Sequence, residues 1–431
     1  MERVDVVIVG AGLAGLACAY ALAGNGLDVM VVERGDYPGA KNVSGGRLYL
    51  GPVRPYLPED LWDHAPFERI VSKERLTMMA DGGSTTLELS SVAFRRGTPP
   101  HSVTVLRGKL DRWLADVVAE KGILIIPKYK VEELLLQDGK VSGIRAGGED
   151  IGASVVVAAD GALSFIAEQA GWWGNHQPRN FALGFKEIIE LPAKTIDDRF
   201  AVSPGQGAAQ LFFGSITQGL FGGGFLYTNR ESLSLGLVLG IQGLMDRQPP
   251  VEVHTLLDAF KERPEVVPLI DGGTTVEYSA HIIPEGGINA LPRLYGDGFL
   301  VVGDAAGLAL NMGLTVRGMD FALASGVIAG RAILAARQRG DFSAASLAQY
   351  EALLKNSFVL KDLATFKKAL QVLDNPRLYT VYPQAVTGIL EQLLTIGPGP
   401  KGRLSATVIG EIRRRLLSWE TVRDAVGFLK M

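Results

Sequence analysis

The sequence predicts a mixed α/β fold, α+β over the whole chain, with a doubly wound nucleotide-binding domain, an antiparallel β-sheet domain and a helical C-terminal region. Three short motifs, far apart in the 431 residues, carry this prediction. They are VVIVGAGLAGL at residues 6–16, VVVAADGALS at 155–164 and DGFLVVGDAAGL at 297–308. In each, an apolar, β-branched run typical of a buried parallel strand ends in a turn that contains glycine. We expect the three motifs to converge on one ligand.

The first motif has the G-x-G-x-x-G spacing of the Rossmann-type dinucleotide-binding turn. Gly10 permits the tight turn, Gly12 lets a pyrophosphate approach the backbone, and Gly15 lets helix and strand pack closely. Residues 13–23 are expected to form the helix, whose free N–H groups and positive dipole end face the phosphates.

An acidic residue follows the second predicted strand of this unit. The strand spans residues 28–32, and Glu33 comes directly after it. A carboxylate there can bond both ribose hydroxyls of an adenosine. The alternative is a glycine-rich turn without a ligand, and the strand–helix–strand order with a terminal acid disfavours it.

The other two motifs separate FAD from NAD. The second strand ends in Asp160-Gly161 and the third in Gly303-Asp304, where Asp304 can accept from ribityl hydroxyls. We expect a helix to start within residues 308–315 and to face the flavin N1–C2=O edge, where its dipole stabilises negative charge. Either motif alone also fits a strand-to-turn junction with Asp as a cap.

With these motifs in place, the chain resembles the FixC branch of the electron-transfer-flavoprotein:quinone oxidoreductases, within the geranylgeranyl-reductase-like flavoprotein superfamily. The resemblance runs over most of the chain and includes residues 39–49 and 107–115. Its most specific segments are residues 222–240 and 303–326, and generic FAD hydroxylases lack the NMGLTVRGMD within the latter.

The resemblance implies an FAD-dependent oxidoreductase in which Arg107 reaches the cofactor phosphates or the adenine side. The motifs and the resemblance together predict FAD contacts at Gly10, Gly12, Leu13, Ala14, Gly15, Glu33, Arg34, Lys41, Gly45, Gly46, Arg107, Val131, Asp160, Gly161, Gly303, Asp304, Gly313, Leu314 and Thr315.

An uncharged segment, residues 212–227, is the candidate substrate site. Gly222, Gly223 and Phe225 are expected to bind an apolar, flat ligand, because successive glycines allow close backbone approach. In the family that the chain resembles, the equivalent stretch lies by the quinone head group. A glycine-kinked core strand is the alternative.

The motifs also predict the division into domains. The discontinuous FAD-binding domain takes residues 1–75, 100–165 and 285–345, the quinone or substrate β-sheet domain takes 76–99 and 166–284, and the C-terminal helical region takes 346–431. Within the sheet domain, residues 76–91 read as a hairpin that turns at Asp81-Gly82-Gly83, and residues 232–241 read as a strand.

Composition excludes several function classes. The net charge of −3 gives no reason to expect nucleic-acid binding. The single cysteine, Cys18, excludes a disulfide within the chain and a four-cysteine cluster, and the five histidines show no metal-ligand spacing. No signal peptide or transmembrane segment is predicted, and the chain is expected in the cytoplasm. One-electron steps need no general acid or base, so no catalytic residue is predicted.

No second G-x-G-x-x-G follows a strand, so electrons must come from NAD(P)H that docks without its own domain or from another protein. The resemblance implies electron-transfer flavoprotein α and β subunits as donor, a small ferredoxin-like [4Fe–4S] subunit and a membrane quinone as acceptor, in a complex that bifurcates electrons from NADH to quinone and ferredoxin. The alternative is a geranylgeranyl-reductase-like or aromatic-hydroxylase-like FAD enzyme that acts directly on an apolar substrate.

Peripheral attachment to the inner face of the membrane is expected through residues 212–227 and 383–398, with Arg413–Arg415 near lipid phosphates. The alternative for the last helices is packing on the core, since Val408, Ile412, Leu416 and Trp419 form one apolar stripe.

Overall fold

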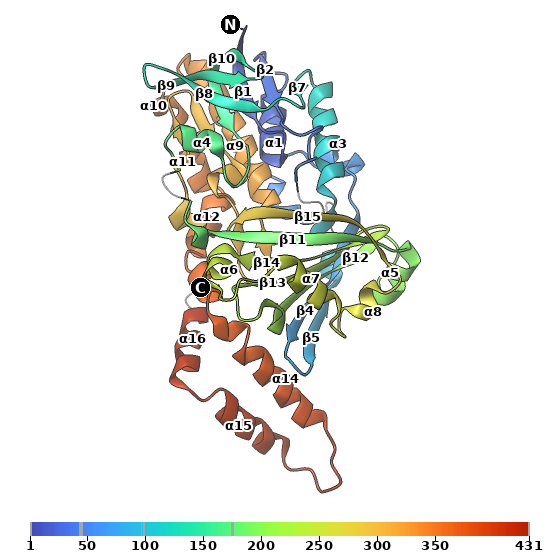
Figure 1. Ribbon diagram of the computed structural model, residues 1–431. Coiled ribbons are helices and arrows are strands. Elements are labelled where there is room, and N and C mark those ends of the chain that lie inside the picture. The colour runs from blue at the N-terminus through green and yellow to red at the C-terminus, as the bar shows by residue number, and fades with distance from the viewer. Residues whose placement is uncertain (1, 43–45, 96, 98–99, 174–175, 430–431) are drawn as a thin grey trace.

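The described residues form two large β-sheets and one small hairpin sheet, with a helical arm below the large sheets, as the computed structural model in Figure 1 shows. The structure describes residues 2–42, 46–95, 97, 100–173 and 176–429. The mixed α/β class with C-terminal helices, predicted from the sequence, is confirmed.

The first sheet brings the three motifs together. Its strands run in the order β16 (Tyr295–Gly296), β17 (Phe299–Val301), β10 (Glu149–Ala158), β1 (Glu2–Val9), β2 (Val29–Val32) and β7 (Leu124–Ile126). From β17 to β7 every pairing is parallel, and β9 (Lys140–Ala146) with β8 (Val131–Gln137) extends β10 as an antiparallel hairpin. The motif strands β17, β10 and β1 are neighbours, so the turns that follow them meet at one end of the sheet.

Two helices pack against each other beside this sheet through small residues. In α1 (Leu13–Leu22) and α9 (Met319–Arg339), a Cβ added at Gly326 would lie 2.1 Å from the carbonyl oxygen of Ala14. Only glycine allows this approach. By length and composition α9 could cross a membrane, but 72% of its most apolar window is buried, as in a core helix. The other helices of this part are α3 (Arg107–Glu120), α4 (Phe165–Gln169), α10 (Ala344–Leu347), α11 (Gln349–Asn356) and α12 (Phe358–Thr365).

The second sheet is antiparallel except where β12 meets β4. Its order is β15 (Thr274–Pro284), β11 (Phe181–Glu190), β14 (Ser232–Gly240), β13 (Gly222–Thr228), β12 (Gln206–Gly214), β4 (Arg69–Met79), β6 (Ser102–Val105) and β3 (Gly46–Tyr49), with β5 (Ser84–Ser90) also on β4. The predicted hairpin is β4–β5, closed where the N–H of Ala80 donates to Gly83 at 2.8 Å, and the strand predicted at 232–241 is β14. β3 and β6 pair in this sheet although their segments lie within the predicted cofactor domain.

Alternation along the strands gives the second sheet two different faces. One face carries a core of large apolar side chains, including Phe185, Leu237 and Phe260, beneath helices on the outer side. These helices are α5 (Ala193–Phe200), α6 (Ile241–Asp246), α7 (Val253–Lys261) and α8 (Val267–Ile270), with the short α2 (Val92–Arg95) after β5. The opposite face borders a cavity.

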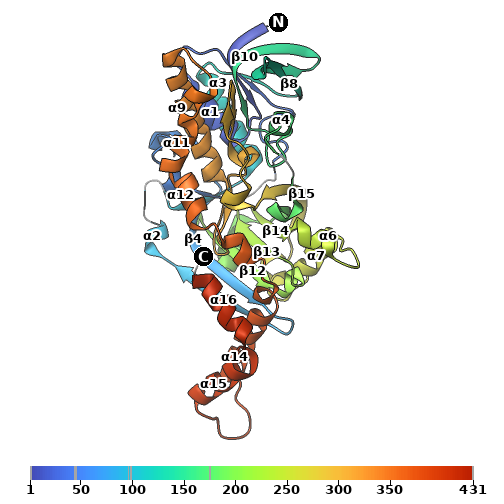
Figure 2. The ribbon, with the colours of Figure 1, turned by 90° about the vertical axis from the view of Figure 1, so that its left-hand side faces the viewer.

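The last helices leave the body of the molecule. After α13 (Ala369–Leu373), the helix α14 (Val381–Leu394) starts against β4, β5 and β12 of the second sheet. Its end and α15 (Leu404–Arg415) form an arm that extends away from both sheets before α16 (Trp419–Leu429) returns (Figures 1 and 2). The expectation that the stripe through Ile412 packs on the core is wrong, because α15 packs on α14 and Ile412 is exposed. Membrane contact through residues 212–227 is also contradicted, since that segment forms buried and half-buried sheet in which only Gln218 is exposed.

Candidate cofactor and substrate site

The three glycines of the first turn meet different surroundings. Gly10 has φ 107°, and an added Cβ would lie 2.4 Å from the carbonyl oxygen of Ala159. At Gly15 an added Cβ would lie 2.0 Å from the carbonyl oxygen of Gly10. Gly12 has an ordinary φ of −83°, and a Cβ there would meet nothing closer than 3.9 Å, where Arg107 lies. Gly10 and Gly15 therefore serve the turn itself, whereas Gly12 keeps space open at the helix N-terminus, as a bound pyrophosphate requires.

Glu33 lies beside this turn. One carboxylate oxygen accepts from the N–H of Ala11 at 2.9 Å and the other from the N–H of Gly35 at 2.6 Å. These bonds hold the buried carboxylate at the end of β2, next to the space that Gly12 leaves.

Arg107 points into the cavity from the first turn of α3. Its guanidinium donates to both carboxylate oxygens of the buried Asp111, at 2.8 Å each, and Asn42 donates to the same carboxylate. The bidentate pair fixes the arginine in one orientation, so the guanidinium edge beside Gly12 is preorganised for an anion.

A half-buried acidic group, Asp304, lies where the first motif meets the third. Burial raises the pKa of the Asp304 carboxyl, while Arg107 and His281 oppose the shift. Burial lowers the pKa of His281, and the nearby Asp304 carboxylate opposes this shift. All three side chains line the same cavity, so Arg107 supplies the positive charge that offsets the Asp304 carboxylate, and His281, whose lowered pKa favours the neutral imidazole, contributes less.

The acid of the second motif has a local structural role. The Asp160 carboxylate accepts from the Ser164 hydroxyl at 2.6 Å and from the N–H of Ile166 at 3.2 Å, at the start of α4. Burial raises the pKa of the Asp160 carboxyl, although the hydrogen bonds from Ser164 and Ile166 lower it. This is the cap that the sequence left open as the alternative, and the neighbouring Gly161, not Asp160, lines the cavity.

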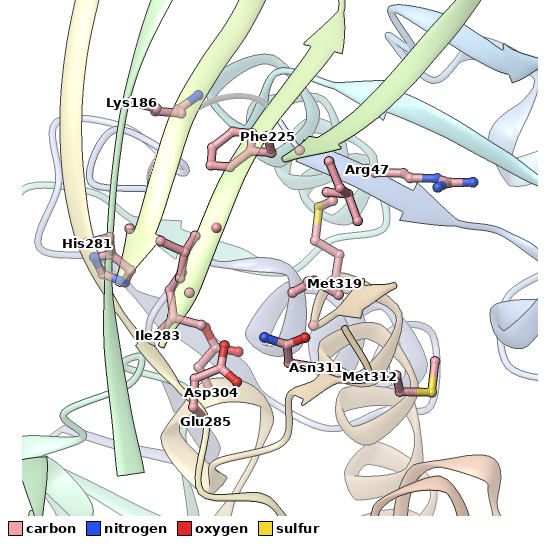
Figure 3. A pocket seen from close by; sticks show the side chains of 18 of the residues that line it. Arg47, Lys186, Phe225, His281, Ile283, Glu285, Asp304, Asn311, Met312 and Met319 are labelled. Atoms are coloured by element: carbon pink, nitrogen blue, oxygen red, sulfur yellow. The ribbon is translucent and has the colours of Figure 1, made fainter. Parts of the chain in front are cut away.

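The cavity has a volume of about 460 Å³ and lies between the two sheets. This is within the roughly 300–1,000 Å³ typical of small-molecule sites. Figure 3 shows Lys186 and Phe225 on the second-sheet side, and Asp304, Glu285 and Asn311 on the other.

Register explains which side chains of the second sheet reach the cavity. Lys186 of β11 pairs with Gly236 of β14, which pairs with Phe225 of β13, and Phe225 pairs with Leu211 of β12. Because residues opposite one another in a sheet point to the same face, this row forms one wall. Leu76 of β4 continues it.

The glycines of β13 line the cavity and are also sterically required. Gly222 has φ 141°, and an added Cβ would lie 2.0 Å from the carbonyl oxygen of Val238. At Gly223 it would lie 2.6 Å from the carbonyl oxygen of Phe212. The segment is therefore a glycine-kinked strand, as the alternative held, and the same glycines line the cavity.

The helix expected to start within residues 308–315 starts later. Residues 310–317 form a small antiparallel hairpin of β18 (Leu310–Asn311) and β19 (Val316–Arg317), and α9 begins at Met319. Its first turn still reaches the cavity, because Gly318 and Met319 line it.

The cavity wall brings together many, not all, of the predicted site residues. Those that line it are Gly12, Leu13, Ala14, Gly46, Arg107, Gly161, Gly222, Gly223, Phe225, Asp304, Gly313 and Leu314. Those that lie outside the wall are Gly10, Gly15, Glu33, Arg34, Lys41, Val131, Asp160, Gly303 and Thr315. Val131 starts β8 and Lys41 is exposed, whereas Gly45 lies outside the described residues.

Sequence reasoning missed polar residues within apolar segments. Lys186 and Glu285 line the cavity and are almost fully buried, and His281 was interpreted as an ordinary polar residue. Burial raises the pKa of Glu285 to about 8, while Asn311 hydrogen-bonds it. The available signal was a charge at an inward position of an apolar strand, as in FALGFKEII, where Lys186 follows Phe185.

Comparison with known proteins shows similarity to FAD-dependent and electron-transfer oxidoreductases. Residues 5–96 match the model of the FAD dependent oxidoreductase family DAO. The chain is 45% identical over 398 residues to Protein FixC of Escherichia coli O157:H7, with 92% of each chain covered. It is 41% identical over 414 residues to the probable electron transfer flavoprotein-quinone oxidoreductase YdiS of Escherichia coli K12, with 96% of this chain and 95% of that one covered.

A solved structure shares the fold. A geranylgeranyl bacteriochlorophyll reductase-like protein from Thermoplasma acidophilum superposes with a TM-score of 0.74 at 20% identity, over 99% of this chain and all of the other. At that identity the similarity shows the architecture alone.

Proposed function

The chain belongs to the FixC family and is an FAD-dependent electron-transfer oxidoreductase, and from this premise we propose that it passes electrons from an electron-transfer flavoprotein to a membrane quinone. FAD, when bound, supplies the redox chemistry by taking up and releasing electrons. The protein binds and orients cofactor and quinone.

The residues of the cavity wall, with Glu33 at the adjacent turn, fit FAD. We assign the pyrophosphate to the open space at Gly12 and the N-terminus of α1, the adenosine ribose to Glu33, and the ribityl chain to Asp304. Arg107, held by Asp111, balances the phosphate charge. The first turn of α9 lies where it would stabilise negative charge on the reduced ring.

The observation that carries the quinone assignment is the apolar cavity beside the second sheet. Its wall of Phe225, Leu211 and Leu76 suits a flat apolar ring. Leu314 and Phe428 also line it while 66% and 47% exposed, and so mark an apolar entrance near the start of the arm. A hydrophobic ligand could enter there from a membrane surface.

Partner chains follow from what the sequence lacks. Cys18 is the only cysteine, and burial raises its pKa to about 12, so this chain supplies no cluster ligands. The absence of a second dinucleotide fingerprint gives NADH no domain of its own. Both support electron-transfer flavoprotein α and β subunits as donor and a separate ferredoxin-like [4Fe–4S] subunit, in a bifurcating complex.

The arm supports peripheral attachment to the inner face of the membrane. Leu394 and Ile396 at its end are 79% and 74% exposed, and Trp419 after α15 is 77% exposed. Arg414 and Arg415 both pair with Glu411, which reduces the positive charge that they offer to lipid phosphates. Apolar insertion would therefore contribute more than charge.

The test is reoxidation of the photoreduced, FAD-loaded chain by decylubiquinone in anaerobic stopped flow. We expect rapid reoxidation by quinone, slowed roughly tenfold or more by Leu211→Trp, which fills the cavity. Leu87→Trp is the matched control, because Leu87 lies in the same cross-strand row, paired with Leu76, but is exposed on β5. Slow reoxidation by quinone but fast reoxidation by oxygen would instead favour the hydroxylase-like alternative.

A further inference from the structure

One buried cation in the cavity has no partner. Lys186 on β11 is 1% exposed, and its Nζ forms no hydrogen bond or ion pair within the described part of the chain. An unsatisfied buried ammonium is costly, and buried polar atoms in native proteins are almost always paired. A lysine in this position therefore points to a hydrogen-bond acceptor that arrives with a ligand.

The neighbouring strands place the Lys186 side chain beside the aromatic wall of the cavity. Gly236 lies between Lys186 and Phe225 in the sheet, and an added Cβ there would lie 2.4 Å from the Cβ of Lys186 and 2.7 Å from the Phe225 ring. The missing side chain at Gly236 lets the lysine stem and the ring lie next to each other, as Figure 3 shows.

Few charges surround the amine. On β15, the Glu277 carboxylate favours the charged form of Lys186. His281 pairs with Gly184, two residues before Lys186 on β11, and so lies on the same face of the sheet. Gly236 on β14 and Phe225 on β13 carry no charge. Tyr227, two residues after Phe225 on the same face of β13, is also neutral, because burial raises the pKa of its hydroxyl. Burial outweighs Glu277 and lowers the pKa of Lys186 to about 7, so the amine gains and loses a proton near neutral pH.

We propose that Lys186 Nζ donates a hydrogen bond to one carbonyl oxygen of the bound quinone and delivers a proton to that oxygen during reduction. The inference rests on the quinone acceptor of the proposed function. Quinone takes two electrons from reduced FAD and two protons, and both C=O groups become C–OH. The Lys186 ammonium supplies one proton, becomes a neutral amine and regains its proton from water, and water supplies the second proton at the other oxygen.

Lys186→Met tests this, since methionine keeps an unbranched apolar stem without the amine. Quinone binding is measured by perturbation of the oxidised flavin spectrum with decylubiquinone, and reoxidation of the photoreduced enzyme is followed from about pH 6 to about pH 9. In the parent, the quinone rate should fall as pH rises through about 7. In Lys186→Met, binding should weaken roughly tenfold or more and the pH step should vanish.

Three controls isolate the role. Ferricyanide accepts electrons without protons, so its rate should be unchanged by Lys186→Met. Lys186→Gln, which retains a neutral donor, should recover part of the binding but not the pH step. Lys73→Met removes another buried lysine that is satisfied by Phe200 and Glu88 outside the cavity, and should leave quinone affinity unchanged.

The outcomes are distinct. Parent-like quinone affinity and pH profile in Lys186→Met, with FAD retained, would overturn the inference while leaving the quinone function intact. A parent that neither binds decylubiquinone nor is reoxidised by it would contradict the proposed function and the inference with it.

Discussion

At the scale of single residues, the glycines of the first motif perform separable tasks. Gly10 and Gly15 face backbone carbonyls at 2.4 and 2.0 Å from an added Cβ, so any side chain there disturbs the fold. Gly12 faces open space with an ordinary backbone conformation. The sequence pattern treats the three alike, and only the structure separates folding from ligand binding.

This separation predicts that Gly12→Val weakens FAD binding without unfolding the protein. The valine would occupy the pyrophosphate space, and overpacking of about 1–3 kcal/mol weakens binding roughly 5- to 150-fold. FAD affinity by equilibrium dialysis and circular dichroism of the apoprotein check this. Gly51→Val is the matched control, because Gly51 has nothing within 4 Å of an added Cβ. An unfolded Gly12→Val chain, or one that binds FAD like the parent, would contradict the assignment.

The residues that sequence reasoning found and missed differ in one physical respect. Asp304 and the motif glycines follow strand ends, where chain direction fixes the position of the next side chain. Lys186 and His281 lie in the middle of strands, and their role depends on which face of which strand meets the cavity. That depends on the pairing of β11 with both β14 and β15, which no local pattern reveals.

At the scale of elements, strongly periodic segments were predicted well and glycine-rich ones were not. The strand of the first motif forms as β1 (Glu2–Val9), and the helix predicted at residues 13–23 forms as α1 (Leu13–Leu22), because apolar runs bounded by glycine leave few alternatives. Residues 310–317 instead form the β18–β19 hairpin, and α9 starts at Met319, where the Arg317 guanidinium donates to the Asp320 carboxylate at 2.8 Å. Tertiary packing places this helix start, and local sequence does not specify it.

The two uncharged segments took opposite roles for a related reason. The strand residues within 212–227 are buried or half-buried because they pair on both sides within the second sheet, whereas residues 383–398 begin half-buried against that sheet in α14 and end exposed at the tip of the arm. Low charge alone does not distinguish a core strand from an exposed apolar surface.

The exposed end of the arm predicts a specific loss of membrane binding. Leu394→Ser with Ile396→Ser should reduce flotation with liposomes, since each side chain contributes about 1 kcal/mol or more of burial in lipid. Leu124→Ser with Leu136→Ser is the matched control, because these exposed leucines lie in β7 and β8 of the first sheet, far from the arm (Figure 1). Equal flotation of both double variants would show that the arm does not attach the protein.

At the scale of the whole molecule, one sheet holds the cofactor motifs and the other provides the apolar wall. The first sheet gathers three turns from residues 10, 160 and 303 at one end, and the second places Lys186 and Phe225 opposite them. Motif order predicted that the three turns converge, because each follows an apolar strand of the same sheet. The membership of β3 and β6 in the second sheet was not predictable, because these strands are short and pair only with distant segments.

The most direct test of the account is the source of electrons. The FAD-loaded chain is mixed anaerobically with NADH alone, and then with NADH and its electron-transfer flavoprotein subunits, while flavin absorbance is recorded. We expect very slow reduction by NADH alone and an increase by orders of magnitude with the partner. Fast, stoichiometric reduction by NADH alone, with no effect of the partner, would contradict the assignment of this chain as an electron-transfer subunit.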